Sequence, residues 1–152
     1  MKTIAITNQK GGVGKTTTSV NLSAGLASRG SRVLLVDLDP QSSASSVLVE
    51  RGAEVWSVYH ALIGEKSARE LVVPTRLENL SVIPASLDMA GAEVEVARMD
   101  NHILQLRRAM EDLRAQEAFD FVLFDCPPSL GILMSNALAA ADEILVPIQC
   151  EY

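Results

Sequence analysis

The stretch Gln9-Lys10-Gly11-Gly12-Val13-Gly14-Lys15-Thr16-Thr17 (QKGGVGKTT, residues 9–17) decides the fold of this chain. It almost matches G-x-x-x-x-G-K-[ST], a pattern of phosphate-binding loops, with Gly14, Lys15 and Thr16 in the last three places. The first place of that pattern is a glycine, but here it is a glutamine, and a second lysine, Lys10, follows it. The stretch is therefore a damaged loop, a chance glycine turn, or a phosphate-binding loop in which Lys10 has its own task.

The residues around this loop place it between a β-strand and an α-helix. Residues 3–7 form a short run with high β propensity, and residues 16–29 carry the apolar content of a helix that ends at Gly30. Residues 32–37 (RVLLVD) form an apolar run capped by an acid, as in a parallel strand that is buried on both faces. The first 37 residues therefore predict a strand, a loop, a helix and a second strand, which together make a βαβ unit.

A loop in this position can bind a chain of phosphate groups. Its backbone N–H groups point inward at one anion, and the N-terminus of the following helix adds a partial positive charge. Lys15 would reach the β- and γ-phosphates, and the Thr16 hydroxyl would bind Mg²⁺. The chain has four lysines, and two of them, Lys10 and Lys15, lie in this loop, which favours a nucleotide site over a structural turn.

The rest of the chain alternates between strands and helices. Further strands are predicted at residues 80–84, 119–125 and 143–149. Helices are predicted at residues 55–63, 67–72, 86–99, 102–116 and 129–141, and a loop at residues 38–46. This alternation predicts an α/β fold, a P-loop NTPase domain over residues 1–152 with a doubly wound, mostly parallel sheet and helices on both faces. Because a further helix would normally cover the last strand, we expect a longer protein that is truncated here at its C-terminus.

Three aspartates stand where apolar strands end. Asp37 closes one strand, Asp39 lies two residues further on, and Asp125 closes another strand. Ligands of open parallel sheets bind at the carboxyl ends of the strands, so these side chains should gather beside the glycine loop. An acid after an apolar strand can hold Mg²⁺ directly or through water, and a carboxylate near the γ-phosphate can orient the attacking water.

Composition narrows the remaining possibilities. With 48% apolar and 4% aromatic residues, the chain suits a globular domain with an aliphatic core. A net charge of −6 argues against strong nucleic-acid binding by this segment alone. The sequence has no secretory segment and no apolar run of membrane-spanning length, which predicts a cytosolic protein. Cys126 and Cys150 lack metal-binding spacing and are predicted to be free, largely buried thiols.

Five stretches of the sequence together resemble a known family. They are KGGVGKTTTSVNLSAGLA (10–27), VLLVDLDPQ (33–41), FDCPPSLG (124–131), NALAAAD (136–142) and VPIQCEY (146–152). In this order they resemble the ParA/Soj partition ATPases, members of the deviant Walker A (SIMIBI-type) group of P-loop NTPases that also includes MinD. The resemblance runs along the whole chain and implies ATP and Mg²⁺ as cofactors.

The resemblance also implies a role for each candidate residue. Lys10 corresponds to a signature lysine that reaches across a face-to-face homodimer to the partner's phosphates, comparable to an arginine finger supplied in trans. Lys15 contacts the phosphates of its own protomer, within a nucleotide-binding loop that runs from Lys10 to Thr17. Asp39 positions the hydrolytic water. Asp37 is a supporting carboxylate near the metal, and Asp125 is the Walker B acid, with Thr16 as a further Mg²⁺ ligand.

The function implied by the resemblance is an ATP-dependent dimerisation switch in chromosome or plasmid segregation. In that family the ATP-bound dimer coats DNA without sequence preference, and a centromere-binding ParB-type partner stimulates its slow hydrolysis. The DNA-binding residues lie mostly in a C-terminal part that this chain does not contain. No membrane contact is expected, and the protein would be cytoplasmic and associated with the nucleoid.

Three other functions remain open. The first is a MinD-like, membrane-associated ATPase that places the division site. The second is a metabolic P-loop enzyme, such as a metal-cluster carrier or an amide-forming synthetase. The third is a binding module that does not hydrolyse its nucleotide, although the intact Lys15, Thr16, Asp39 and Asp125 weigh against it.

Overall fold

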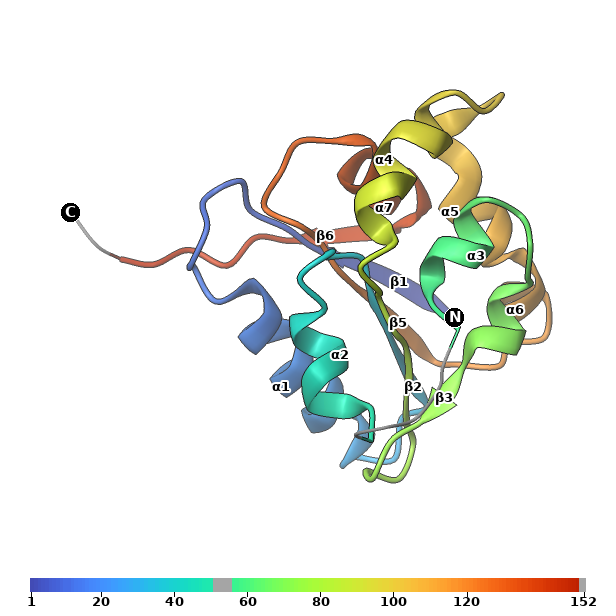
Figure 1. Ribbon diagram of the computed structural model, residues 1–152. Coiled ribbons are helices and arrows are strands. Elements are labelled where there is room, and N and C mark those ends of the chain that lie inside the picture. Colours follow the sequence, from blue (N-terminus) through green and yellow to red (C-terminus); the bar gives the residue numbers. More distant parts are fainter. Residues whose placement is uncertain (51–55, 151–152) are drawn as a thin grey trace.

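The computed structural model describes residues 1–50 and 56–150. A sheet of six strands has the order β3-β4-β2-β5-β1-β6 (Figure 1). The strands are β1 (Lys2–Ile6), β2 (Val33–Asp37), β3 (Val73–Pro74), β4 (Leu80–Ile83), β5 (Phe121–Asp125) and β6 (Glu143–Leu145). All neighbouring strands are parallel except β3, which runs antiparallel to β4 at one edge. The predicted mostly parallel α/β sheet is confirmed.

The three central strands, β1, β5 and β2, end at the same level. In the pairing register Ile6 lies opposite Asp125, and Asp125 lies opposite Asp37. The connections that follow these strands therefore leave the sheet at one edge, which is where parallel α/β sheets bind their ligands.

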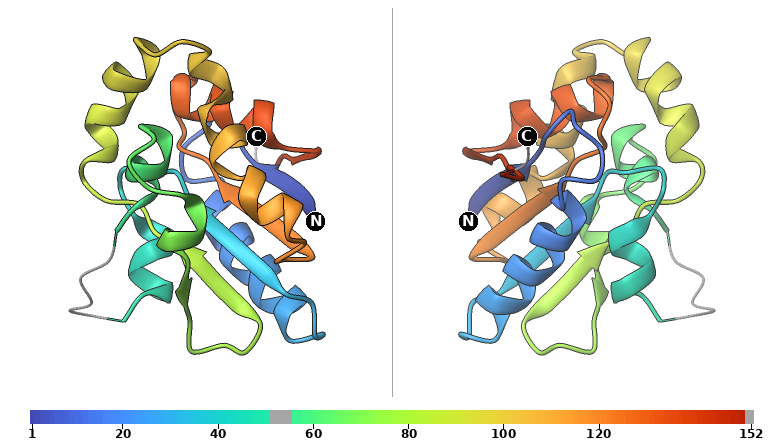
Figure 2. Two further views of the ribbon diagram at one scale, coloured as in Figure 1. Left: turned by 90° about the vertical axis from the view of Figure 1, so that its right-hand side faces the viewer. Right: turned by 90° about the vertical axis from the view of Figure 1, so that its left-hand side faces the viewer.

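Helices cover both faces of the sheet, as Figures 1 and 2 show. α1 (Lys15–Ala27) and α2 (Ser43–Leu48) lie on the face that carries Val33 and Leu35. The remaining helices lie on the face that carries Leu34 and Val36. They are α3 (Val58–Leu62), η1 (Ala68–Leu71), α4 (Met89–Ala97), η2 (His102–Leu104), α5 (Gln105–Ala109), α6 (Glu111–Ala115) and α7 (Ile132–Ala140). Because successive strand residues point to opposite faces, β2 is buried along its whole length.

Two elements near the candidate site differ from the predictions. α2 begins at Ser43, inside the predicted loop 38–46, because the Asp37 carboxylate accepts the Ser45 N–H and so satisfies a donor of the first turn. The strand predicted at residues 143–149 ends at Leu145. Pro147 has no N–H to give to a ladder, and its carbonyl accepts the Asn8 side-chain amide at 2.9 Å instead.

The helix predicted over residues 102–116 is also divided, into η2, α5 and α6. In an unbroken α-helix the Leu106 N–H would donate to the His102 carbonyl. Here the buried side chain of Asn136 stands between them, accepting the Leu106 N–H at 3.0 Å and donating to the His102 carbonyl at 2.7 Å. One side chain from α7 thus replaces a helical hydrogen bond and interrupts the helix between η2 and α5.

Among the helices of the described residues, none has both the length and the apolar composition needed to cross a membrane.

Candidate nucleotide-binding site

The glycine loop between β1 and α1 has an open, left-handed backbone. Gly12 has φ +74° and Gly14 has φ +86°, a region that side-chain-bearing residues rarely adopt. A Cβ built on Gly11, Gly12 or Gly14 would meet no heavy atom within 4 Å, so these residues face open space. The glycines therefore let the backbone turn sharply and leave its N–H groups accessible to a ligand.

The N-terminus of α1 is free of competing acids. Gly14 is its N-cap, no side chain caps it, and its first turn contains no acidic residue. The first N–H groups of a helix have no partner within the helix, and together with the helix dipole they attract an anion. This end of α1 is therefore suited to bind phosphate.

The two lysines of the loop lie in different environments. Lys15 is only 8% exposed, and its Nζ donates to the Lys10 carbonyl at 3.3 Å. Lys10 is exposed, and its backbone N–H donates to the Asn8 side chain at 2.9 Å. Within residues 1–50 and 56–150 the Lys10 ammonium makes no hydrogen bond or ion pair. Lys15 is therefore held at the loop, whereas Lys10 projects into solvent.

A hollow of about 300 Å³ brings together residues that are far apart in the sequence. It is lined by Gly11, Gly12, Gly14, Lys15, Thr16, Thr17, Asp39 and Pro128. Asp39 belongs to the connection after β2 and Pro128 to the connection after β5. These two connections lie close together because β2 and β5 end opposite each other. Of the other candidate residues, Val13 is buried beneath the loop and Lys10 lies outside the hollow.

Asp125 lies at the end of β5, fully buried, and keeps one carboxylate oxygen without a partner. Its Oδ1 accepts the Ser19 hydroxyl at 2.9 Å, whereas its Oδ2 has no hydrogen-bond partner among the described residues. Burial raises the pKa of Asp125 from 3.8 to about 6, whereas the nearby Thr16 and Ser19 hydroxyls act to lower it. Ser19 was not among the predicted site residues, although its place one helical turn after Lys15 puts both on the buried side of α1.

Asp37 is equally buried, but both of its carboxylate oxygens have partners. Oδ2 accepts the Ser45 N–H at 2.8 Å and the Ser45 hydroxyl at 2.7 Å, and Oδ1 accepts the Asp39 N–H at 3.1 Å. Burial raises the pKa of Asp37, and the hydrogen bonds from Ser45 and Asp39 oppose that rise. Neither Asp37 nor Asp125 lines the hollow, and the role of each beside a metal stays a prediction.

The oxygen atoms near the hollow fit a hard cation such as Mg²⁺. The Thr16 hydroxyl lies close to Asp125, whose second oxygen is the unpartnered buried atom. The described residues contain no group of three or more His, Cys, Asp or Glu side chains that could hold a metal by themselves. This suits Mg²⁺, which usually keeps several waters and combines one or two protein ligands with substrate phosphates.

The two cysteines differ in environment. Cys126 is buried as predicted, and burial raises the pKa of its thiol to about 12, so it is unreactive at neutral pH. Cys150 is exposed, so the prediction of a buried thiol was wrong for that residue. It follows β6 in a segment without regular structure, where Ile148 is also exposed.

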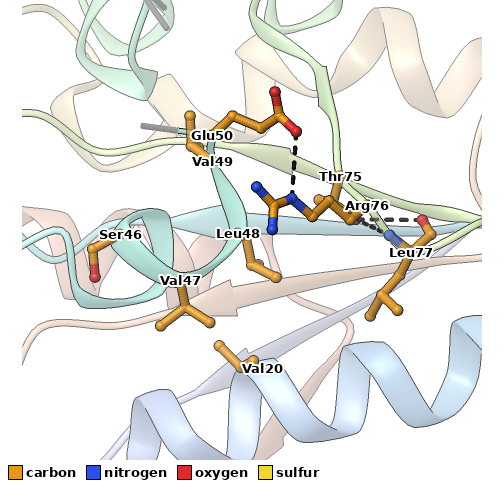
Figure 3. Close-up of a pocket in the computed structure, with 9 residues that line it drawn as sticks. All are labelled: Val20, Ser46, Val47, Leu48, Val49, Glu50, Thr75, Arg76 and Leu77. Carbon is orange, nitrogen blue, oxygen red and sulfur yellow. Dashed lines mark hydrogen bonds and ion pairs between the residues drawn. The ribbon is translucent and has the colours of Figure 1, made fainter. Parts of the chain in front are cut away.

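A second hollow, of about 520 Å³, lies on a different part of the surface (Figure 3). Val20 of α1, the end of α2 and the connection between β3 and β4 line it, and the side chains of Val20, Val47 and Leu77 lie on its lower side. Its charged groups are Glu50 and Arg76, which form an exposed ion pair at 3.3 Å. It has no glycine loop and no free helix N-terminus, so the smaller hollow is the better candidate for phosphate chemistry.

Comparisons with known proteins show the family of this chain. A family model described as an AAA domain matches residues 1–152. The chain is 51% identical to the chromosome partitioning protein ParA of Myxococcus xanthus, over 98% of this chain and 52% of that protein. It is 50% identical to the sporulation initiation inhibitor protein Soj of Bacillus subtilis, over 99% of this chain and 59% of that protein. The chain belongs to the ParA/Soj family of AAA domains. It spans between half and three fifths of the length of these relatives.

Solved structures with the same fold contain nucleotides. A cobyrinic acid a,c-diamide synthase from Mycobacterium smegmatis, with bound ADP and magnesium, is 41% identical and superposes with a TM-score of 0.93, over 100% of this chain and 61% of that one. A putative plasmid partition protein from Borrelia burgdorferi, bound to AMPPNP, is 28% identical with a TM-score of 0.87, over 96% of this chain and 60% of that one.

Proposed function

We propose that this chain is the nucleotide-binding part of an ATP-hydrolysing switch that dimerises on binding ATP and acts in chromosome or plasmid segregation. One observation carries the proposal. The glycine loop, Lys15, Asp39 and Pro128 line a single hollow at the free N-terminus of α1. Phosphate-binding groups and a carboxylate able to orient water are thus placed together.

Each residue of the hollow has a chemical task in this proposal. The backbone N–H groups of the loop and of the first turn of α1 bind the phosphates, and Lys15 holds the terminal ones in position. Asp39 orients the attacking water and accepts its proton. Thr16 and Asp125 hold the cation, with Asp37 as a more distant support. Mg²⁺, when bound, would neutralise charge on the β- and γ-phosphate oxygens.

Lys10 is the residue that makes dimerisation part of the proposal. Its ammonium is exposed beside the hollow rather than inside it. In a homodimer that closes face to face, this cation could reach the phosphates held by the other protomer and supply charge in trans. Binding of ATP would then create the attraction between two protomers, and hydrolysis would remove it.

The biological role and the partners are proposed from the relatives. Two proteins named for chromosome partitioning, a ParA and a Soj ATPase, are 51% and 50% identical to this chain. A ParB-type partner that stimulates slow hydrolysis, and non-specific DNA bound outside these 152 residues, would follow from such a role. The net charge of −6 is compatible with a DNA-binding surface elsewhere in the protein. The protein would then act in the cytoplasm, at the nucleoid.

A second candidate function follows from one of the similar solved structures. Because a cobyrinic acid a,c-diamide synthase is 41% identical, an amide-forming synthetase is the alternative. The two functions predict different co-substrates. Hydrolysis that depends on a carboxylic acid and on an ammonia donor would indicate a synthetase, whereas hydrolysis stimulated by DNA and a centromere-binding protein would indicate partition.

The full-length protein is used to test the proposal. Lys15→Ala should lower the rate of ATP hydrolysis by ~100-fold or more, because it removes a charge that faces the phosphates. Lys10→Ala should remain monomeric with ATP in light scattering, and Asp39→Ala should accumulate as an ATP-bound dimer. Lys66→Ala is the matched control, since Lys66 lies far along the chain in an ion pair with Glu70. Wild-type protein that neither hydrolyses ATP nor changes its mass with ATP would refute the proposal.

A further inference from the structure

Ser45 of α2 occupies a buried junction between the candidate site and the centre of the sheet. It is 5% exposed, and its hydroxyl has two partners. The hydroxyl donates to Asp37 Oδ2 at 2.7 Å and accepts the backbone N–H of Ala85 at 2.9 Å. Its own backbone N–H donates to the same Asp37 oxygen at 2.8 Å. The Ser45 hydroxyl thus both donates and accepts a hydrogen bond in the core, where a polar group needs partners.

We propose that Ser45 is a positioning residue for ATP hydrolysis, acting through Asp37 to hold Asp39 at the hollow. This inference rests on the proposed function, because Asp39 is assigned there to orient the attacking water. Ser45 itself does not line the hollow and touches no nucleotide group directly.

The path from Ser45 to Asp39 is a chain of short hydrogen bonds. Ser45 fixes one oxygen of Asp37, and the other oxygen accepts the Asp39 N–H at 3.1 Å. Asp39 in turn organises the turn that follows it, since its Oδ1 accepts the Gln41 N–H at 2.9 Å and its carbonyl accepts the Ser42 N–H at 2.8 Å. The Asp39 carboxylate is therefore bonded from one side and leaves its other oxygen for the hollow.

The other side of the junction is also held by hydrogen bonds. Ala85 follows β4, and its neighbour Pro84 accepts the Val58 N–H of α3 at 2.8 Å. The next residue, Ser86, shares a hydrogen bond of 2.9 Å with Ser57, the N-cap of α3. Ser45 thus connects the Asp39 turn, at the carboxyl edge of the sheet, with α3 on the face that carries Leu34 and Val36.

The chemistry of the junction restricts the residue at position 45. The hydroxyl must donate to a carboxylate and accept from a backbone N–H at the same time, which serine and threonine can do and alanine cannot. Without it, the Ala85 N–H is left buried without its acceptor, and Asp37 loses its shortest hydrogen bond. The Asp37 carboxylate could then rotate, and its hydrogen bond from the Asp39 N–H would no longer hold the Asp39 backbone in place.

The first test compares steady-state kinetics of three variants. Ser45→Ala should lower kcat roughly 10-fold, because small displacements of a positioning group slow chemistry strongly, while KM for ATP stays within about twofold. Ser45→Thr keeps the hydroxyl and should restore most of kcat. The matched control is Ser23→Ala, since Ser23 is also buried on this face but its hydroxyl has no partner among the described residues. Wild-type kcat in Ser45→Ala would overturn the inference.

A double variant separates positioning from general damage to the fold. If Ser45 acts through Asp39, adding Ser45→Ala to Asp39→Ala should slow the residual hydrolysis no further. A further slowing of the same size as in the wild-type background would mean that Ser45 has only a structural effect, and the inference would fail.

A third measurement does not depend on hydrolysis and so tests Ser45 even if the proposed function fails. Hydrogen exchange of the amides of residues 38–42 should speed up at least ~10-fold in Ser45→Ala, with exchange in residues 11–17 unchanged. Equal acceleration in both segments, or none in residues 38–42, would refute the positioning role. If the wild-type protein does not hydrolyse ATP but Ser45→Ala shows the expected exchange pattern, the proposed function would be refuted and the positioning role of Ser45 would stand.

Discussion

The end of β2 and the end of β5 look alike in the sequence but differ in the structure. The two strands are neighbours, each closes with an aspartate, and Asp37 lies directly opposite Asp125. Both side chains are fully buried, and burial raises the pKa of both. At Asp37 the protein supplies a donor to each oxygen, whereas at Asp125 one oxygen has no partner among the described residues. The hydrogen bonds of one strand end are complete, whereas the other end keeps an oxygen that a ligand could bind.

The cost of the incomplete end supports a functional reading of Asp125. A buried polar atom without a partner costs about 1–3 kcal/mol, and more when it is charged. The Thr16 hydroxyl beside this carboxylate would let a cation offset that cost. Asp37 carries no such cost, so its hydrogen bonds explain it without a metal.

The largest expected effect comes from removing the charge at the incomplete end. Asp125→Asn should lower the rate of ATP hydrolysis by ~100-fold, because the charge that helps to hold the cation is lost. Hydrolysis would be measured by phosphate release at saturating Mg²⁺ and ATP. The matched control is Asp120→Asn at the other end of β5, where Asp120 pairs with Arg32 on the surface. A rate within twofold of wild type in Asp125→Asn would show that Asp125 has no role in ATP hydrolysis.

A smaller effect is expected at the completed end, in stability. Asp37→Asn puts an NH₂ group where one carboxylate oxygen now accepts hydrogen bonds, so at least one donor from Ser45 or Asp39 loses its acceptor. We expect the free energy of unfolding to fall by about 2 kcal/mol. Asp125→Asn should not lower it, since the amide oxygen can keep the Ser19 bond and a buried charge is removed. Urea unfolding at pH 7 without nucleotide measures both, and equal losses would contradict the comparison.

The parts of the site that depend on neighbouring residues or on general sheet geometry could be predicted from the sequence. The glycine loop lies between an apolar strand and a helix, so the residues next to it in the sequence were enough to predict its position in the fold. The approach of Asp39 to that loop followed from a general property of parallel sheets, since strand ends share an edge. These expectations needed no knowledge of individual side-chain contacts.

The remaining details depend on contacts between residues that are distant in the sequence. Ser45 became part of a buried junction through Ala85, 40 residues later, and no local pattern marks that pair. Asn136 interrupts the helix predicted over residues 102–116 by hydrogen bonds to His102 and Leu106, which lie 34 and 30 residues earlier in the sequence. α2 was missed because its first turn depends on the Asp37 carboxylate rather than on its own serines.

The smallest effect expected is in the pH dependence of stability. The pKa of Asp125 is about 6 in the folded chain and 3.8 as its ordinary value, so between these values the folded chain binds more protons than the unfolded one. Stability without nucleotide should therefore rise as the pH falls from 7 to 5, by about 1 kcal/mol from this residue, since one pKa unit corresponds to ~1.4 kcal/mol. Asp37 acts in the same direction, because its pKa is also raised.

Asp125→Asn isolates this contribution, because asparagine does not titrate. The difference in unfolding free energy between wild type and Asp125→Asn should shrink or shift in favour of the wild type as the pH falls to 5. The carboxylates whose pKa is lowered, such as Asp120 at about 2 beside Arg32, stay ionised over this range and do not contribute. A constant difference from pH 7 to pH 5 would mean that Asp125 is not held in an unfavourable charged state. The contrast between the two strand ends would then rest on hydrogen-bond geometry alone, and the incomplete end would no longer be evidence for a cation.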